Sequence, residues 1–75
     1  MRYFFHVVGT RATEQPVIDK HGEEFIQDED AMSHAAAIAR ELAQDTSLDG
    51  FAILVTDERG QEIGQVPIVM RGDGS

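Results

Sequence analysis

Residues 28–46 read DEDAMSHAAAIARELAQDT, and this stretch decides the fold. Its main apolar residues recur at steps of four, three and four, which is the spacing of one face of an amphipathic helix. The residues of this stripe are Ala31, Ala35, Ile38 and Leu42. We therefore predict one helix over about 28–46, packed by its apolar stripe against a small sheet.

The start of the predicted helix is acidic. Asp28 stands where an N-cap is expected, and Glu29 and Asp30 fall in the first turn, where negative charge complements the helix dipole. The buried stripe is mostly alanine, so the helix axis can sit close to the sheet, and the sheet must supply the bulk of the core. The large residues available for this purpose are Tyr3, Phe5, Phe51 and Ile53.

Four segments outside the helix have the composition of β-strands. They are rich in β-branched and aromatic residues and are bounded by glycine, proline or turn residues. Their ranges are 2–8, 16–18, 51–56 and 61–70. Pro67 cannot donate a ladder hydrogen bond, which places it at a sheet edge or a bulge. The predicted fold is α+β in the order β-β-α-β-β, a mostly antiparallel sheet of three to four strands with the helix on one face.

Two turns share one sequence pattern. Asp19-Lys20-His21-Gly22 follows the second predicted strand, and Asp57-Glu58-Arg59-Gly60 separates the third from the fourth. Aspartate at the first position and glycine at the fourth favour a type I turn whose glycine has a positive φ. We expect the later copy to close a hairpin and the earlier copy to direct the chain toward the helix.

The first predicted strand is apolar on both faces, which is unusual for a strand with water on one side. Along it, Tyr3, Phe5 and Val7 alternate with Phe4, His6 and Val8. A single helix covers only one face, so we expect this strand to lie inside the sheet, with a second subunit as one candidate to cover its other face. The candidate interaction patch comprises Tyr3, Phe4, Phe5, His6 and Val8.

Length, composition and charge restrict the class of protein. The 75 residues allow one core, which we place at 1–70, with 71–75 as a flexible tail. The absence of cysteine excludes disulfides and thiolate metal sites, and small domains without such links often self-associate. A net charge of −8 with six scattered Lys and Arg residues argues against direct binding to nucleic acid or to an anionic membrane. The longest apolar runs are five residues, so we expect no membrane span and a cytoplasmic protein.

The chain carries no recognisable pattern of a catalytic or metal site. His6, His21 and His34 fall on a strand, a turn and the helix without ligand spacing, and we expect His34 to contact Asp30 one helical turn earlier. The carboxylates between positions 23 and 30 lack the alternation and the bend glycine of a calcium loop. We therefore expect no enzyme, no cofactor and no bound metal. A metal-dependent hydrolase would require these histidines and carboxylates to converge in space.

Four short motifs span the chain: an opening R-Y-F-F-H, a D-x-x-G turn, an alanine-spaced helix and a later V-x-D-E-x-G. Their residues are 2–6, Asp19, Gly22, Ala31, Ala35, Ala39, Glu41, Leu42, 55–58 and Gly60. In these motifs the chain resembles a family of very small, uncharacterised bacterial proteins known only as a domain of unknown function. The connection at 9–15 is longer here than in that family. The resemblance implies the same fold order and brings no activity, and it singles out Tyr3, Phe4, Phe5 and His6.

Three functions are compatible with these observations. The leading hypothesis is a non-catalytic protein-interaction module, expected to be a homodimer, that uses the exposed face of the first strand or a sheet edge. The second is an acidic regulatory partner that neutralises a basic protein, by fold-level analogy with antitoxin domains in which a β-hairpin leads into an alanine-rich helix. The third is a metal-dependent enzyme.

Overall fold

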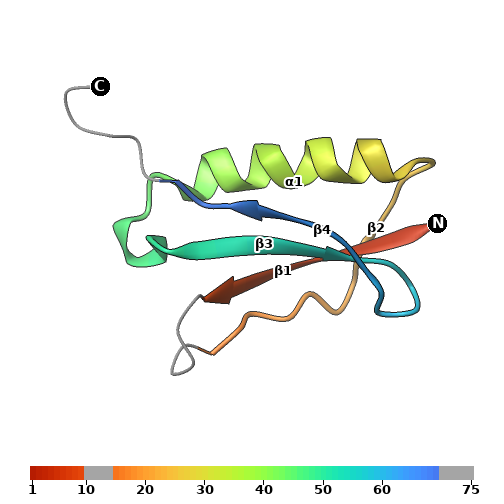
Figure 1. Ribbon diagram of the computed structural model, residues 1–75, viewed down its shortest axis with the longest axis horizontal. Helices are drawn as coiled ribbons and strands as arrows, with labels where there is room; N and C mark the ends of the chain where they lie inside the picture. The colour runs from red at the N-terminus through yellow and green to blue at the C-terminus, as the bar shows by residue number, and fades with distance from the viewer. Residues whose placement is uncertain (10–14, 70–75) are drawn as a thin grey trace.

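The computed structural model describes residues 1–9 and 15–69 of the chain. In chain order its elements are β1 (Arg2–Gly9), β2 (Glu23–Glu24), α1 (Asp28–Leu42), the short 3₁₀ helix η1 (Thr46–Leu48), β3 (Phe51–Thr56) and β4 (Glu62–Pro67). The strands form an antiparallel sheet in the order β2-β1-β3-β4, and α1 lies across one face of it (Figure 1). The predicted α+β class and the order β-β-α-β-β are confirmed.

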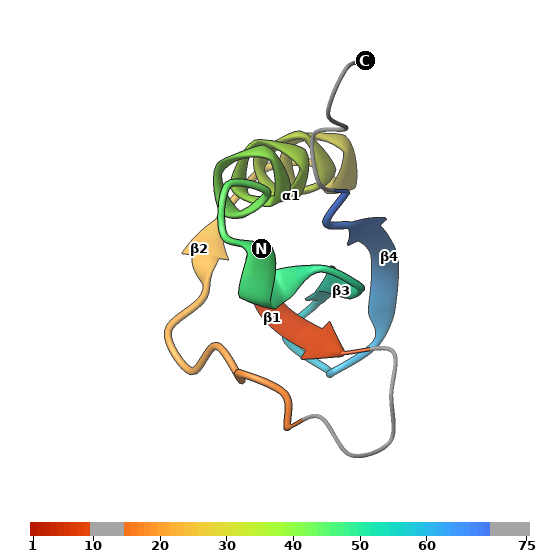
Figure 2. The ribbon, with the colours of Figure 1, turned by 90° about the vertical axis from the view of Figure 1, so that its left-hand side faces the viewer.

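Strand β1 lies inside the sheet, as its two apolar faces predict. It pairs with β3 from Phe4 opposite Thr56 to Gly9 opposite Phe51, while its first residues pair with β2. The segment that leads into β2 swings to the side of the sheet opposite α1 before it returns to the edge of β1 (Figure 2). Both faces of β1 are therefore at least partly covered within one copy of the chain.

The second strand is not where the sequence predicts it. Within the expected range 16–18, Val17 makes only an isolated antiparallel bridge with Val7, and the strand is Glu23–Glu24 instead. Glutamate has a low preference for strands, but these two residues lie beside the free backbone groups at the start of β1. Position along the edge of β1, rather than side-chain type, decides this pairing.

The core lies between α1 and the sheet. Ala31 and Ala35 are fully buried and Ala39 is nearly so, and they pack against large sheet residues that include Tyr3 and Ile53. This confirms the predicted arrangement of a small-residue helix on a bulky sheet. Ile38 and Leu42, which the sequence places in the buried stripe, are only half-buried at its flank.

Both ends of α1 differ from the prediction. Asp28 is the first helical residue rather than the N-cap; Gln27 holds the cap position without a side-chain hydrogen bond. The carboxylate of Asp28 instead accepts a hydrogen bond from the Tyr3 hydroxyl, so a tertiary contact replaces local capping. The helix ends at Leu42 rather than near position 46, and η1 follows it.

The two D-x-x-G turns form as predicted. In each, one carboxylate oxygen of the leading aspartate accepts two backbone N–H groups in or next to the turn, at 2.9–3.2 Å. Gly22 and Gly60 have φ of 70° and 79°, in the left-handed region that glycine adopts readily. The later turn closes the β3–β4 hairpin, whose pairing is irregular next to it.

The fourth strand ends at Pro67, before the predicted limit of 70. The predicted tail at 71–75 lies outside the described residues, as do residues 10–14 of the connection after β1. Within the described part of the chain, no helix is both long and apolar enough to cross a membrane.

Candidate functional site

The five residues of the candidate interaction patch lie on opposite faces of β1. Tyr3 and Phe5 face α1, where Tyr3 is 2% exposed and Phe5 packs against the core. Phe4, His6 and Val8 alternate with them on the other face and are half-buried. The structure thus brings only these last three onto one surface.

The ring of His6 connects three segments on that second face. Its Nδ1 accepts a hydrogen bond from the backbone N–H of Asp19 at 3.0 Å, and its Nε2 lies 3.1 Å from Thr56 Oγ1. Because Nδ1 acts as an acceptor, the proton of the neutral ring is on Nε2, which donates to Thr56. Phe4 stacks on the same ring, with planes 4° apart. These contacts give His6 a structural role that joins β1, β3 and the segment before β2.

The outer edge of β1 is covered by the segment before β2. Val7 and Val17 exchange two backbone hydrogen bonds of 3.0 and 2.8 Å. Next to them, the N–H of Phe5 donates to Asp19 Oδ2 at 3.1 Å. Burial alone would raise the pKa of Asp19, but the hydrogen bonds from the backbone N–H groups of Phe5, Gly22 and His21 hold that pKa below its ordinary value. On this edge of the sheet, both backbone groups of Val7 and the N–H of Phe5 are thus bonded within one copy.

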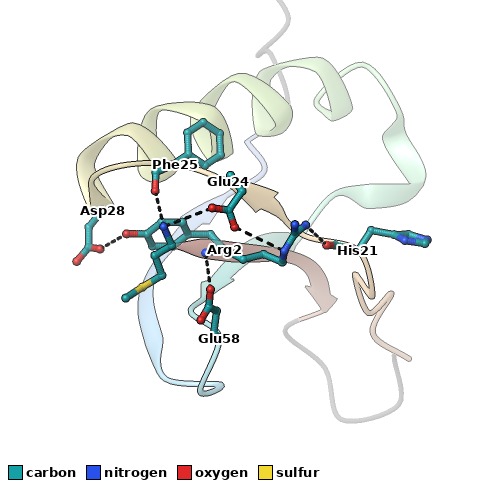
Figure 3. A network of polar contacts seen from close by, with 8 residues as sticks. Arg2, His21, Glu24, Phe25, Asp28 and Glu58 are labelled. Atoms are coloured by element: carbon teal, nitrogen blue, oxygen red, sulfur yellow. Dashed lines mark hydrogen bonds and ion pairs between the residues drawn. The ribbon is translucent and has the colours of Figure 1, made fainter.

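The start of β1 carries a network of polar contacts (Figure 3). Arg2 donates its backbone N–H to Glu58 Oε2 at 2.9 Å and its Nη1 to the carbonyl of His21 at 2.8 Å. Its Nε lies 3.6 Å from Glu24 Oε2. Arg2 therefore holds the β3–β4 turn and β2 against β1. Part of the acidic group near the start of α1 is thus engaged inside the molecule.

The three histidines do not converge. His34 on α1 packs against Phe25 with ring centroids 5.2 Å apart, and its Nε2 lies 3.5 Å from Glu23 Oε2 rather than pairing with the expected Asp30. His6 is on the other face of the sheet, and His21 is exposed in its turn. Among residues 1–9 and 15–69, no three His, Asp or Glu side chains are grouped as a metal site requires.

Strand β4 forms the opposite edge of the sheet. The N–H of Ile68 donates to the carbonyl of Phe51 at 2.8 Å, and backbone groups in an antiparallel ladder point alternately toward and away from the neighbouring strand. In the observed register, Val66 therefore faces β3, whereas Gln65 and Pro67 direct their backbone groups outward. Pro67 loses no ladder bond at this position, which confirms its predicted place at an edge. No segment within the described ranges pairs with this edge.

A groove runs beside the β4 edge, between it and the second half of α1. It has a volume of about 210 Å³. Its lining is Ala36, Ala39, Arg40, Ala43, Val66, Pro67 and Val69. Val69 is 68% exposed at its rim. The sequence prediction missed this groove: Pro67 indicated the edge, but only the fold shows which flank of α1 lies next to it.

One family model matches nearly the whole chain. It is described as a domain of unknown function (DUF6894) and covers residues 2–69. The chain belongs to this family. The DUF6894 match includes the opening strand, the helix and the β4 edge, and it confirms the expected resemblance to an uncharacterised family. No curated protein and no solved structure matches the chain. The family description carries no activity, so the function of this DUF6894 domain has to be argued from its surfaces.

Proposed function

We propose that this DUF6894 domain is a non-catalytic module that self-associates through the β4 edge of its sheet. The observation that carries the proposal is the difference between the two edges. The outer edge of β1 is occupied by Val17 and Asp19, whereas Gln65 on β4 directs its backbone groups outward, with no partner in the described part of the chain. An open strand edge is a template for a strand from another chain.

The groove beside β4 supports the same choice of surface. When a strand is added to a sheet edge, the main-chain hydrogen bonds give affinity and neighbouring pockets give specificity. The groove is mostly apolar and reaches the exposed Val69, so an added chain would bury side chains as well as backbone. A domain of this size gains stability from such burial, because folding removes a smaller share of its surface from water than it does in a larger domain.

The contacts of the histidines favour a module without catalysis. His6 is held by Asp19 and Thr56, and His34 packs among Phe5 and Phe25. Both rings therefore make contacts that stabilise the fold, which is a structural role. The face of β1 that carries His6 is also half-covered, which makes it a weaker candidate for association than the β4 edge.

Sedimentation equilibrium tests this proposal. We expect the wild-type chain to form a reversible dimer of twice its 8.3 kDa mass. Gln65→Pro removes the outward N–H group and Pro67→Asp places a charge on the edge, and each variant should sediment as a folded monomer. Ile18→Asp is the matched control, since Ile18 is 53% exposed and lies on the segment beside β1. A monomeric wild type, or a dimer lost only in Ile18→Asp, would contradict the proposal.

A second candidate function, capture of a basic protein, is favoured by one observation. Four exposed carboxylates gather on β2 and the first turn of α1: Glu23, Glu24, Glu29 and Asp30. Binding of a polylysine peptide that weakens with salt and is lost in Glu23→Lys combined with Asp30→Lys would support this candidate. Binding that is unchanged in this variant would exclude these carboxylates as the site.

A further inference from the structure

The flank of α1 that lies along β4 has a symmetric arrangement. Its members are Glu29, Met32, Ala36 and Arg40, followed by the C-cap residue Ala43, at steps of three, four, four and three. Met32 lies directly over Gly64, since a Cβ at Gly64 would meet Met32 Cε at 2.7 Å. Ala36, Arg40 and Ala43 line the groove with Val66 and Pro67. The flank therefore follows β4 in the same chain direction, with Ala36 at its centre.

Two copies of this flank that run antiparallel to each other are complementary. In an antiparallel arrangement centred on Ala36, Met32 of one copy lies opposite Arg40 of the other, because both are four residues from the centre. Glu29 lies one turn beyond Met32, about 4.5 Å along the helix axis, within reach of the long Arg40 side chain. Both Glu29 and Arg40 are exposed in the single copy.

We infer that the groove between α1 and β4 is filled by the same region of a second copy, in an antiparallel two-fold arrangement. In it β4 pairs with β4, the two α1 helices cross at Ala36, and each Arg40 pairs with the partner's Glu29. This inference rests on the proposed self-association through β4 and specifies its geometry. The partner's Met32 is the flexible side chain that faces the groove.

The spacing of the elements is compatible with this arrangement. Neighbouring strands lie about 4.8 Å apart. Helix α1 packs over β3 and β4, so a two-fold axis just outside β4 would set the two helix axes about 10 Å apart. Packed helix axes lie about 8–10 Å apart depending on the side chains at the contact, and Ala36 on each copy leaves room for this approach.

The net charge of −8 on each copy opposes association. At physiological ionic strength, however, exposed charges more than about 8 Å apart are largely screened from one another. The two Arg40–Glu29 pairs place opposite charges in direct contact at the interface itself. Electrostatics at short range therefore favours the antiparallel orientation, even though the two acidic copies repel at longer range.

Cysteine cross-linking tests this geometry, because the chain has no cysteine of its own. Ala36→Cys should form a disulfide-linked dimer on mild oxidation, since the two positions meet at the axis. Ala37→Cys is the matched control: Ala37 is the next residue and is exposed on the far side of α1, so it should stay unlinked. Equal linking of both variants, or linking of Ala37→Cys alone, would overturn the arrangement.

Charge reversal tests the ion pairs with the dimer Kd measured by sedimentation. Arg40→Glu and Glu29→Arg should each raise the Kd about tenfold, and the double variant should restore it. Glu41→Arg, an exposed reversal on another flank, should not weaken the dimer. If the wild type dimerises without cross-linking at Ala36→Cys and without rescue by the double variant, this inference falls while the proposed function stands. If the wild type is monomeric, both fall.

Discussion

The hydroxyl of Tyr3 on β1 donates a 2.5 Å hydrogen bond to Asp28 Oδ1 in the first turn of α1. Tyr3 is 2% exposed, so this bond fixes the start of the helix over the sheet from inside the core. The hydrogen bond to Asp28, the burial of the ring and the negative charge of Asp28 raise the pKa of Tyr3 to about 12. The contact between these two residues reports directly on whether the helix is docked.

Titration of Tyr3 therefore has a clear expected outcome. It is the only tyrosine in a chain without tryptophan, so tyrosinate absorbance follows this one group. The pKa is raised by folding from its ordinary value near 10, so the stabilisation is complete below about pH 10 and is lost as the pH rises toward about 12. We expect titration near 12 in the native chain and near 10 in urea.

The substitution Asp28→Asn tests whether Asp28 is the cause of the raised pKa of Tyr3. The amide oxygen still accepts the hydrogen bond, but the carboxylate charge is gone. The native pKa of Tyr3 should fall toward 10, and the melting temperature should fall by about 5 °C. An unchanged titration in this variant would show that the ring is not held by Asp28.

Replacement of Asp19, on the segment that covers β1, should lower the free energy of unfolding more than replacement of an exposed aspartate elsewhere in the chain. Its Oδ1 accepts from two backbone N–H groups of its turn, and its Oδ2 accepts from Phe5. Asparagine has one acceptor oxygen, so Asp19→Asn directs an N–H group at one of these donors. We expect a loss of about 2 kcal/mol in urea unfolding at neutral pH, and almost none for the exposed Asp49→Asn.

The pH dependence of this effect has a defined sign. The pKa of Asp19 is lowered by folding, so its contribution is present above its unfolded value of about 3.9 and is lost as the pH falls through the native value. Wild type and Asp19→Asn should therefore converge in stability in acid. A constant difference between them down to about pH 2 would contradict the account.

Replacement of Gly22 and of Gly60 by alanine should lower the free energy of unfolding by different amounts, although both glycines end a D-x-x-G turn. Both have positive φ, but a Cβ at Gly60 would meet nothing within 4 Å, whereas at Gly22 it would lie 2.7 Å from the Tyr3 carbonyl oxygen. We expect Gly60→Ala to cost about 1 kcal/mol from backbone strain alone. Gly22→Ala adds a backbone clash and should cost about 3 kcal/mol. Equal losses in urea unfolding would show that β2 is not held against β1 as described.

Most of the fold could be predicted from the sequence because local patterns determine it. The alanine spacing gives α1, and the two D-x-x-G motifs give turns whose hydrogen bonds stay within a few residues. Pro67 indicates an edge because proline lacks the N–H that an interior strand needs. These features depend on short-range geometry, which a sequence displays directly.

The errors occur where a contact between distant segments replaces a local one. Asp28 bonds Tyr3 instead of capping α1, and His34 lies against Glu23 from β2 instead of Asp30. The sequence pattern also cannot show which flank of α1 lies over β4. The groove beside Arg40 therefore becomes visible only once the strand order is known.

Hydrogen exchange at the Gln65 backbone amide, followed by NMR over a range of protein concentrations, tests the central proposal most directly. This N–H points outward from β4, whereas the N–H of Ile68 is bonded to β3 in every copy. We predict that Gln65 becomes protected as the concentration rises through the dimer Kd, while Ile68 is protected throughout. Protection of Gln65 that does not change with concentration, or a dimer in which Gln65 still exchanges freely, would contradict self-association through the β4 edge.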